Sequence, residues 1–265
     1  MTEHEAIYST NDGMRFGELS GEITGPDDHR SPVVLLHGLT FDRRMWAPMV
    51  DALKGRRVLA LDLPGHGDSC RRNSYDLREV VEVLHDAIRA AQVTRPVLVG
   101  HSIGGVLATM YASSYPVRAV MNVDQPLLPG PFGEYLRSVE TVLRGPEYLS
   151  VWGGLLAGMG AERLDPRLRE LLRSNPRQDI LLGYWKEILE TSPVILHARR
   201  THELTALREA GTTYHYISRT SVDTGYKKWF QTMLPEAGIT VVPGNGHFPH
   251  VARPESLVAI LSGWT

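Results

Sequence analysis

The stretch that decides the fold is Val97-Leu98-Val99-Gly100-His101-Ser102-Ile103-Gly104-Gly105. Its apolar beginning is typical of a buried parallel strand, and the small residues over 103–114 predict a helix. A serine at such a sharp strand-to-helix turn has a strained backbone, and a glycine on each side lets the chain pass closely. The turn lifts the hydroxyl clear of the sheet, near the positive end of the helix dipole. We therefore predict that Ser102 is a nucleophile.

Around this stretch, short apolar or β-branched runs alternate with helical stretches, which predicts βαβ units and a mostly parallel sheet. An opening hairpin is expected from residues 6–9 and 14–19 around the turn Asn11-Asp12-Gly13. Residues 125–210 lack a convincing strand and predict an all-helical insertion, although these helices could instead simply complete the main core. Further strands are predicted over residues 33–36, 57–61, 117–123, 213–217 and 239–242, and helices over 44–54, 75–91, 226–233 and 255–261.

The composition is that of an ordinary globular protein of one domain, with or without an insertion. The chain has 265 residues, 42% hydrophobic and 22% charged, and a formal net charge of −2, which favours neither nucleic acid nor an anionic membrane. Cys70 is the single cysteine, so an internal disulfide is impossible and a reducing compartment fits. The N-terminus lacks a signal-peptide pattern, and no apolar run reaches the ~20 residues of a membrane span. We expect a cytoplasmic monomer or homodimer that acts on a small molecule without a cofactor or metal.

His247 is the candidate base for Ser102, because a serine hydroxyl needs a base within hydrogen-bond reach. It follows the last predicted strand, 239–242, after a Gly244-Asn245-Gly246 turn. That position projects it from the carboxyl edge of the sheet, where catalytic groups gather in open α/β sheets.

Four other histidines lie near these motifs, and packing explains each of them adequately. His37 precedes a glycine at a strand end and is expected to shape a loop, and His66 is expected to be structural. His101 and His250 flank the candidate nucleophile and base, where contact with substrate is the alternative to packing.

Taken together, the motifs resemble those of the α/β-hydrolase fold family over essentially the whole chain. The order and spacing of four motifs carry the resemblance: His37-Gly38, Asp62-Leu63-Pro64-Gly65-His66-Gly67-Asp68-Ser69, Gly100 to Gly104, and Gly246-His247. The resemblance implies an eight-stranded, mostly parallel sheet flanked by helices. It also implies a hydrolase core of residues 1–124 and 211–265, with residues 125–210 as a helical cap over the active site.

An oxyanion hole needs two hydrogen-bond donors aimed at the developing charge. In this fold one donor is the backbone N–H of the residue after the nucleophile, here Ile103. By resemblance, the second is the N–H of the residue after His-Gly, here Leu39. A glycine at position 38 agrees with that role, because it lets the chain approach closely.

The acid that should orient His247 departs from the family pattern. By resemblance it belongs in a Gly-x-x-Asp turn after the strand 213–217, but Ser218 replaces the glycine and Ser221 stands where the aspartate would be. Asp223 lies two residues later and could serve if the loop bends differently. Asp124 directly follows the strand 117–123, the place where some family members, including haloalkane dehalogenases, carry their acid. We prefer Asp124 and keep Asp223 as its rival.

The leading functional hypothesis is hydrolysis of a carboxylic ester, lactone or similar acyl compound through an acyl-enzyme on Ser102. A serine nucleophile argues against epoxide hydrolysis and dehalogenation, because an alkyl-enzyme ester requires a carboxylate. Carbon–carbon bond hydrolysis, perhydrolysis and lyase chemistry remain alternatives by resemblance, and a small-molecule receptor with a slow site is the alternative of another class. Candidates for an apolar acyl pocket lie in the insertion: Tyr148, Trp152, Leu155, Leu156, Leu181, Leu182 and Trp185.

Overall fold

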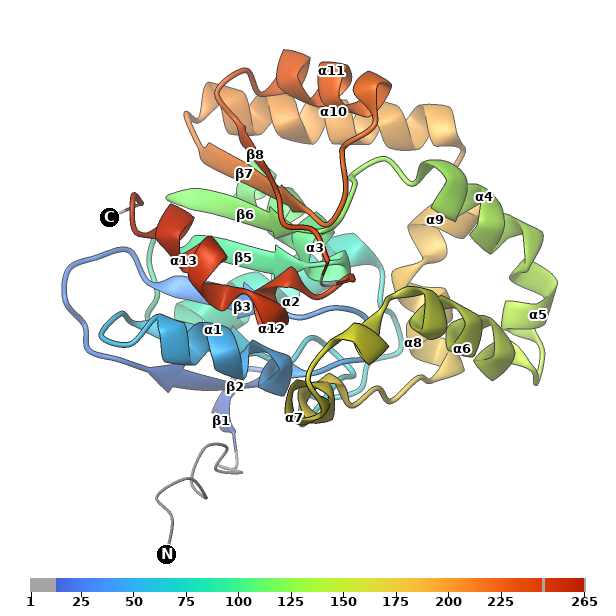
Figure 1. Ribbon diagram of the computed structural model, residues 1–265, viewed down its shortest axis with the longest axis horizontal. Helices are drawn as coiled ribbons and strands as arrows, with labels where there is room; N and C mark the ends of the chain where they lie inside the picture. Colours follow the sequence, from blue (N-terminus) through green and yellow to red (C-terminus); the bar gives the residue numbers. More distant parts are fainter. Residues whose placement is uncertain (1–12, 245, 265) are drawn as a thin grey trace, which may run out of the picture.

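The computed structural model of the chain describes residues 13–244 and 246–264. These residues form an eight-stranded sheet in the order β1-β2-β4-β3-β5-β6-β7-β8 (Figure 1). β1 and β2 pair antiparallel with each other, β2 pairs antiparallel with β4, and the remaining pairings are parallel. The strands are β1 (Met14–Phe16), β2 (Leu19–Thr24), β3 (Val33–Leu36), β4 (Val58–Leu61), β5 (Val97–His101), β6 (Ala119–Val123), β7 (Thr213–Ser218) and β8 (Gly238–Val241).

Helices cover both faces of the sheet (Figure 1). One face carries α1 (Ala47–Ala52), α12 (Pro249–Ala252) and α13 (Pro254–Leu261), which contact one another. The other face carries α2 (Leu77–Ala90), α3 (Ile103–Ser114), α10 (Pro193–Glu209) and α11 (Thr224–Met233), with α3 in contact with α2 and α10.

Alternation along the strands divides the apolar residues between these two layers. Val34 and Leu36 of β3 belong to the core under α2 and α3, whereas Val33 and Leu35 belong to the core under α1 and α13. Successive side chains of a strand point to opposite faces, so a strand buried on both sides reads as one continuous apolar run. The predicted α/β-hydrolase architecture, with its mostly parallel eight-stranded sheet, is therefore confirmed.

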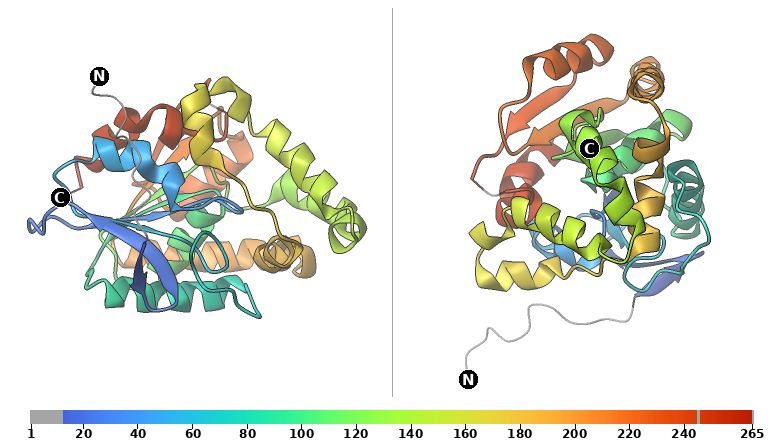
Figure 2. Two further views of the ribbon diagram at one scale, coloured as in Figure 1. Left: turned by 90° about the horizontal axis from the view of Figure 1, so that it is seen from below. Right: turned by 90° about the vertical axis from the view of Figure 1, so that its right-hand side faces the viewer.

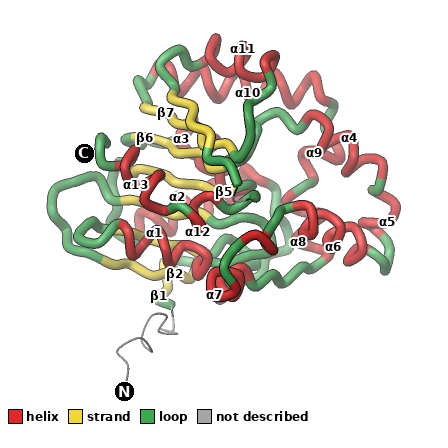
Figure 3. Tube along the Cα trace, viewed as in Figure 1, coloured by secondary structure: helices red, strands yellow, loops and turns green. Residues whose placement is uncertain are grey.

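Six helices after β6 gather beyond the carboxyl ends of the strands, at the right and lower centre of Figure 1 and toward the viewer in the right-hand view of Figure 2. Residues 125–210, all of them described, contain helices and loops but no strand (Figure 3). Short 3-10 turns, Ala161–Arg163 and Glu170–Leu172, lie on either side of the helix Pro166–Arg169. The helices are α4 (Gly130–Ser138), α5 (Glu140–Arg144), α6 (Tyr148–Gly158), α7 (Pro166–Arg169), α8 (Gln178–Tyr184) and α9 (Lys186–Glu190). α10 differs from them, because it packs against α3 and α11 beside the sheet.

Two expected elements differ from the structure. The strand expected over residues 14–19 is broken by a turn at Gly17, whose φ of 61° suits glycine, so the observed hairpin joins β1 to β2. The expected strand 6–9 and the Asn11-Asp12 part of its turn lie outside the described residues. The helix expected over 44–54 begins instead as a 3-10 turn at Arg43–Trp46 and continues as α1.

Candidate active site

Strand register brings the candidate residues to one edge of the sheet. β5 pairs in parallel with β6 so that His101 lies opposite Val123. The next residues along the chain, Ser102 and Asp124, therefore leave the sheet side by side at its carboxyl edge. β3 also ends beside β5, which brings the loop 37–40 to the same edge. The strand order reverses between β3 and β5, the place where open α/β sheets bind ligands.

Ser102 occupies the sharp turn between β5 and α3. Its φ of 53° and ψ of −124° are a strained conformation for a residue with a side chain. The neighbouring glycines are required by close approach: a Cβ at Gly100 would lie 2.0 Å from the Gly104 oxygen, and one at Gly104 would lie 2.2 Å from the Leu36 oxygen. The half-buried Ser102 hydroxyl donates to Gln125 Oε1 over 3.4 Å.

Asp124 contacts His247. Asp124 Oδ2 lies 2.6 Å from His247 Nδ1, and the other carboxylate oxygen accepts the backbone N–H of Arg219 at 2.8 Å. Both side chains are largely withdrawn from solvent, with 5% of the Asp124 side chain and 12% of the His247 side chain exposed. Because a carboxylate only accepts, Nδ1 of the ring carries the proton and Nε2 is left free to accept one.

The rival acid, Asp223, lies elsewhere. It is exposed and forms the N-cap of α11, where its Oδ1 accepts the backbone N–H of Tyr226 at 2.9 Å. Ser218, which replaces the glycine of the family pattern, donates its hydroxyl to the Thr220 oxygen at 2.7 Å and so closes the turn locally. Ser221, at the position of the family's aspartate, is exposed. The structure thus brings Asp124, and not Asp223, to His247.

The two candidate oxyanion donors, Leu39 and Ile103, lie in the loops after β3 and β5. Ile103 is the first residue of α3, where a helix N–H has no intrahelical acceptor. Within residues 13–244 and 246–264, neither of these two amides donates to an acceptor of the chain. Both are consequently available to an oxygen placed beside Ser102.

Two buried histidines hold the loop that contains Leu39. His37 Nε2 accepts the Leu63 amide at 2.9 Å, and His66 Nε2 accepts the Thr40 amide at 3.0 Å. Each Nδ1 faces a backbone carbonyl, at 2.8 and 3.0 Å, so both rings are neutral donors there. Burial lowers the pKa of both histidines, that of His66 to about 3. The loops after β3 and β4 are therefore linked through neutral imidazoles.

His101 is fully buried behind the candidate site, where it cannot reach a substrate. Its Nε2 donates to the backbone oxygen of His247 at 2.7 Å. Its ring also lies against the loop after β3, since a Cβ at Gly38 would come within 2.7 Å of its Nδ1. The buried His250 ring follows at 4.4 Å, with Trp46 4.5 Å beyond it. Burial holds the pKa of His101 and of His250 well below the ordinary value, so this stack stays uncharged.

Gln125 is the residue beside the candidate nucleophile that sequence reasoning missed. Its side chain accepts from the Ser102 hydroxyl and donates to the Pro126 oxygen at 2.8 Å, and its backbone oxygen accepts from Asn122 Nδ2. The only signal in the sequence is its place directly after Asp124 at a strand end. The candidate pocket residues Trp152, Leu181 and Trp185 are buried, and they extend the apolar cluster under α2 and α3 into the insertion. The other candidates, Tyr148, Leu155, Leu156 and Leu182, are half-buried.

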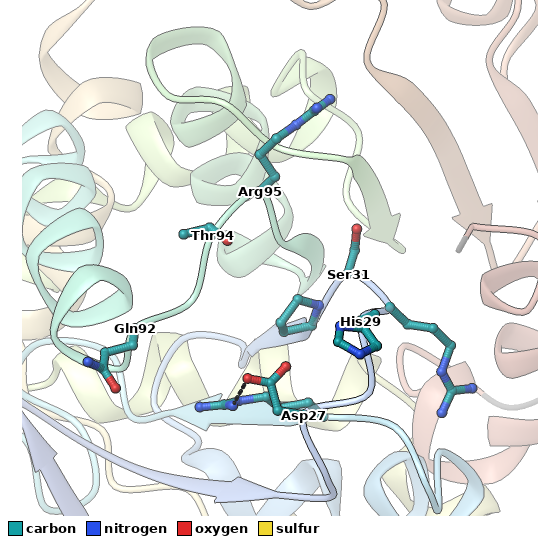
Figure 4. A pocket seen from close by; sticks show the side chains of 9 residues that line it. Asp27, His29, Ser31, Gln92, Thr94 and Arg95 are labelled. Carbon is teal, nitrogen blue, oxygen red and sulfur yellow. Dashed lines mark ion pairs between the residues drawn. The ribbon is translucent and has the colours of Figure 1, made fainter.

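A separate polar pocket of about 300 Å³ lies at the opposite edge of the sheet (Figure 4). It is lined by residues from the loops 27–32 and 92–95 and by Arg57, at the amino ends of β3, β4 and β5. Arg57 pairs with Asp27 at 2.9 Å, and Figure 4 shows Arg95 directed away from Asp27. This pocket therefore takes no part in the site around Ser102.

Neither a metal cluster nor a membrane span is found in the described residues. No group of three or more histidine, cysteine or acidic side chains there could hold a metal ion. No described helix combines the length and apolar character needed to cross a membrane.

Residues 33–260 match the sequence profile of the Alpha/beta hydrolase family, and the chain belongs to this family. A pimeloyl-[acyl-carrier protein] methyl ester esterase from Nitrosomonas europaea is 27% identical over 89% of this chain and 94% of its own. A putative 2-succinyl-6-hydroxy-2,4-cyclohexadiene-1-carboxylate synthase from Bacillus subtilis is 24% identical over 96% of each chain. Two further curated relatives match over only 37% and 35% of their own length, about a third of each.

Among solved structures, the fold is similar to that of AqdC, described as recognising and cleaving the ring of the Pseudomonas quinolone signal. The TM-score is 0.77 with 20% sequence identity, over 93% of this chain and 95% of that one. A likeness at that identity defines the fold and says nothing of the reaction.

Proposed function

We propose that this protein is a serine hydrolase that cleaves a carboxylic ester, lactone or similar small acyl compound. The observation that carries the proposal is the hydrogen bond between Asp124 and His247 beside the strained turn of Ser102. An acid, an imidazole and a hydroxyl at one sheet edge are the groups that acyl transfer requires. The full-length similarity to a methyl ester esterase supports the same class of substrate.

In the proposed reaction, the Ser102 oxygen attacks the acyl carbon while His247 Nε2 takes the hydroxyl proton. The Leu39 and Ile103 amides stabilise the negative oxygen of the tetrahedral intermediate. Asp124 stabilises the imidazolium, which then returns the proton to the leaving alcohol. Water, activated by the same imidazole, attacks the acyl-enzyme and releases the acid and free Ser102.

We further propose that α4 to α9 form a cap over this site. These helices lie beyond the edge at which Ser102 and Asp124 leave the sheet (Figure 1). The rings of Phe41, Trp152, Trp185 and Phe132 follow one another with centroids 6.5, 6.1 and 5.9 Å apart, from the loop after β3 into α4. Such a row of aromatic rings gives the proposed cap an apolar interior, which is compatible with an apolar acyl group.

The test is hydrolysis of short p-nitrophenyl esters by the wild type and by Ser102→Ala. Ser113→Ala is a matched control, because its hydroxyl only donates to the Met110 oxygen at 2.7 Å, near the far end of the same helix. Ser102→Ala should lose turnover and labelling by a fluorophosphonate, while Ser113→Ala keeps both. Equal rates for Ser102→Ala and the wild type would refute the proposal. Stoichiometric labelling without turnover on a wide panel would favour a receptor role.

A second candidate is a lyase in which His247 removes a proton from the substrate and no acyl-enzyme forms. Two observations favour it: within the described residues the Ser102 hydroxyl donates to Gln125 and forms no hydrogen bond with His247, and the synthase from Bacillus subtilis is similar over nearly the whole chain. Intact mass after rapid acid quench separates the two reactions. An acyl adduct on Ser102 supports the hydrolase, and turnover of a substrate without any adduct supports the lyase.

A further inference from the structure

The chain between α6 and α8 contacts both loops that carry the proposed machinery. We call residues 159–175 the brace. At its start, the Met159 oxygen accepts the backbone N–H of His247 at 2.7 Å. At its end, the Asn175 N–H donates to the Thr40 oxygen at 2.9 Å. Thr40 directly follows Leu39, so one segment of the insertion touches the base on one side and the oxyanion loop on the other.

The contact with the oxyanion loop includes a side chain with two partners. Ser174 Oγ lies 2.7 Å from Thr40 Oγ1 and accepts Trp152 Nε1 at 3.0 Å. Thr40 is 2% exposed, and Trp152, on α6, is 3% exposed. The Ser174 hydroxyl thus connects a buried ring of the insertion with a buried residue of the oxyanion loop.

Thr40 needs such support because of its backbone. Its φ of 68° is in the left-handed region, which β-branched residues rarely adopt. A strained residue keeps that conformation only when its surroundings hold it. Three contacts do so: its N–H donates to His66, its oxygen accepts from Asn175, and its hydroxyl meets Ser174.

The contact with the His247 loop is equally close. Gly246 has a φ of 59°, and a Cβ there would lie 2.3 Å from the Met159 oxygen. Gly160 faces it, since a Cβ on Gly160 would come within 3.1 Å of the Gly246 Cα. The His247 backbone is therefore held at its N–H by the brace and at its oxygen by His101.

We propose that Ser174 is a positioning residue for the oxyanion hole, which holds the Leu39 amide in place through Thr40. The inference rests on the proposed function, in which Leu39 is an oxyanion donor. A displaced donor stabilises the transition state less, because the negative charge on the oxygen develops there. Ground-state binding of the ester stays largely unchanged. The insertion then acts on the chemical step as well as on the choice of substrate.

The experiment compares Ser174→Ala and Ser174→Thr with the wild type on a p-nitrophenyl ester. Ser150→Ala is the matched control, because this exposed hydroxyl of α6 donates only to the Glu147 oxygen at 2.8 Å. For Ser174→Ala, kcat should fall about tenfold with KM within about twofold. Phenylboronic acid, which forms a tetrahedral adduct, should bind about tenfold more weakly. Ser174→Thr should restore most of kcat because it keeps the hydroxyl, and Ser150→Ala should match the wild type.

Three results would overturn the inference: an unchanged kcat in Ser174→Ala, a rise in KM alone, or equal losses in Ser174→Thr and Ser174→Ala. If the wild type neither turns over an ester nor labels with a fluorophosphonate, the proposed function itself fails. In that case, amide hydrogen exchange tests the contact between the brace and Thr40 independently of any activity. The Asn175 amide should exchange faster in Ser174→Ala than in the wild type, and unchanged exchange would exclude a brace at Thr40.

Discussion

Replacing Asp124 by asparagine is expected to reverse the tautomer of His247. The Arg219 N–H donates to Asp124 Oδ1 at 2.8 Å, so the atom at that position must remain an oxygen. The asparagine would then place its NH2 group where Oδ2 now lies, 2.6 Å from His247 Nδ1. Facing a donor, Nδ1 must accept, and the ring proton moves to Nε2. With Nε2 protonated, the imidazole cannot take the proton of Ser102.

The expected loss follows from this geometry. A triad whose imidazole is held in the wrong tautomer loses about 10⁴ in kcat, or roughly 5.5 kcal/mol of transition-state stabilisation. The loss should fall on kcat, with KM close to that of the wild type, because the substrate-binding groups are unchanged. Steady-state kinetics on a p-nitrophenyl ester at pH 7 measure both, and a thermal melt checks that the variant is folded.

Asp223→Asn is the matched control, because Asp223 only caps α11 through the Tyr226 N–H. Asparagine is as good an N-cap as aspartate, so kcat should stay within about twofold of the wild type. The reasoning is refuted if Asp124→Asn retains kcat within about tenfold of the wild type. It is also refuted if Asp223→Asn causes the larger loss.

Three further predictions concern stability and the turn at Ser102. The pKa of His66 is about 3 in the folded protein against 6.5 for a free histidine, so the unfolded chain binds the proton first. Because of this group, stability is lost as the pH falls from about 6.5 toward 3, by up to about 1.4 kcal/mol per pH unit, and His66→Gln should make the pH dependence of the urea-unfolding free energy less steep over this range. Arg200→Met removes the partner of Glu203 on α10 and one of the two partners of Glu187 on α9, which keeps Arg199; both carboxylates are largely buried. We expect a cost of about 3 kcal/mol and a melting temperature lower by roughly 6–12 °C, and an unchanged melt would contradict this. Gly104→Ala places a Cβ 2.2 Å from the Leu36 oxygen of β3 and should therefore displace the turn at Ser102. The folded fraction of this variant should no longer be labelled by a fluorophosphonate, and mass spectrometry measures the labelling.

The sequence alone determined the parts of this protein that depend on local pattern. The apolar runs of β3, β4 and β5 predicted a sheet buried on both sides, because such strands cannot expose either face. The glycines at 100 and 104 predicted the turn at Ser102, because neither position has room for a Cβ. The order of the four motifs around His37, Asp62, Ser102 and His247 was sufficient to identify the Alpha/beta hydrolase family.

Tertiary structure alone decided which acid faces His247. Asp124 and Asp223 both follow strands that end at the same edge of the sheet, so strand order could not separate them. The turn after β7 closes on itself and gives Asp223 to the N-terminus of α11, whereas Asp124 leaves β6 directly beside His247. The contact of Ser174 with Thr40, 134 residues apart, was likewise invisible in the sequence. Local patterns fix backbone conformation, but a side-chain partner distant in the chain is set by how the loops pack.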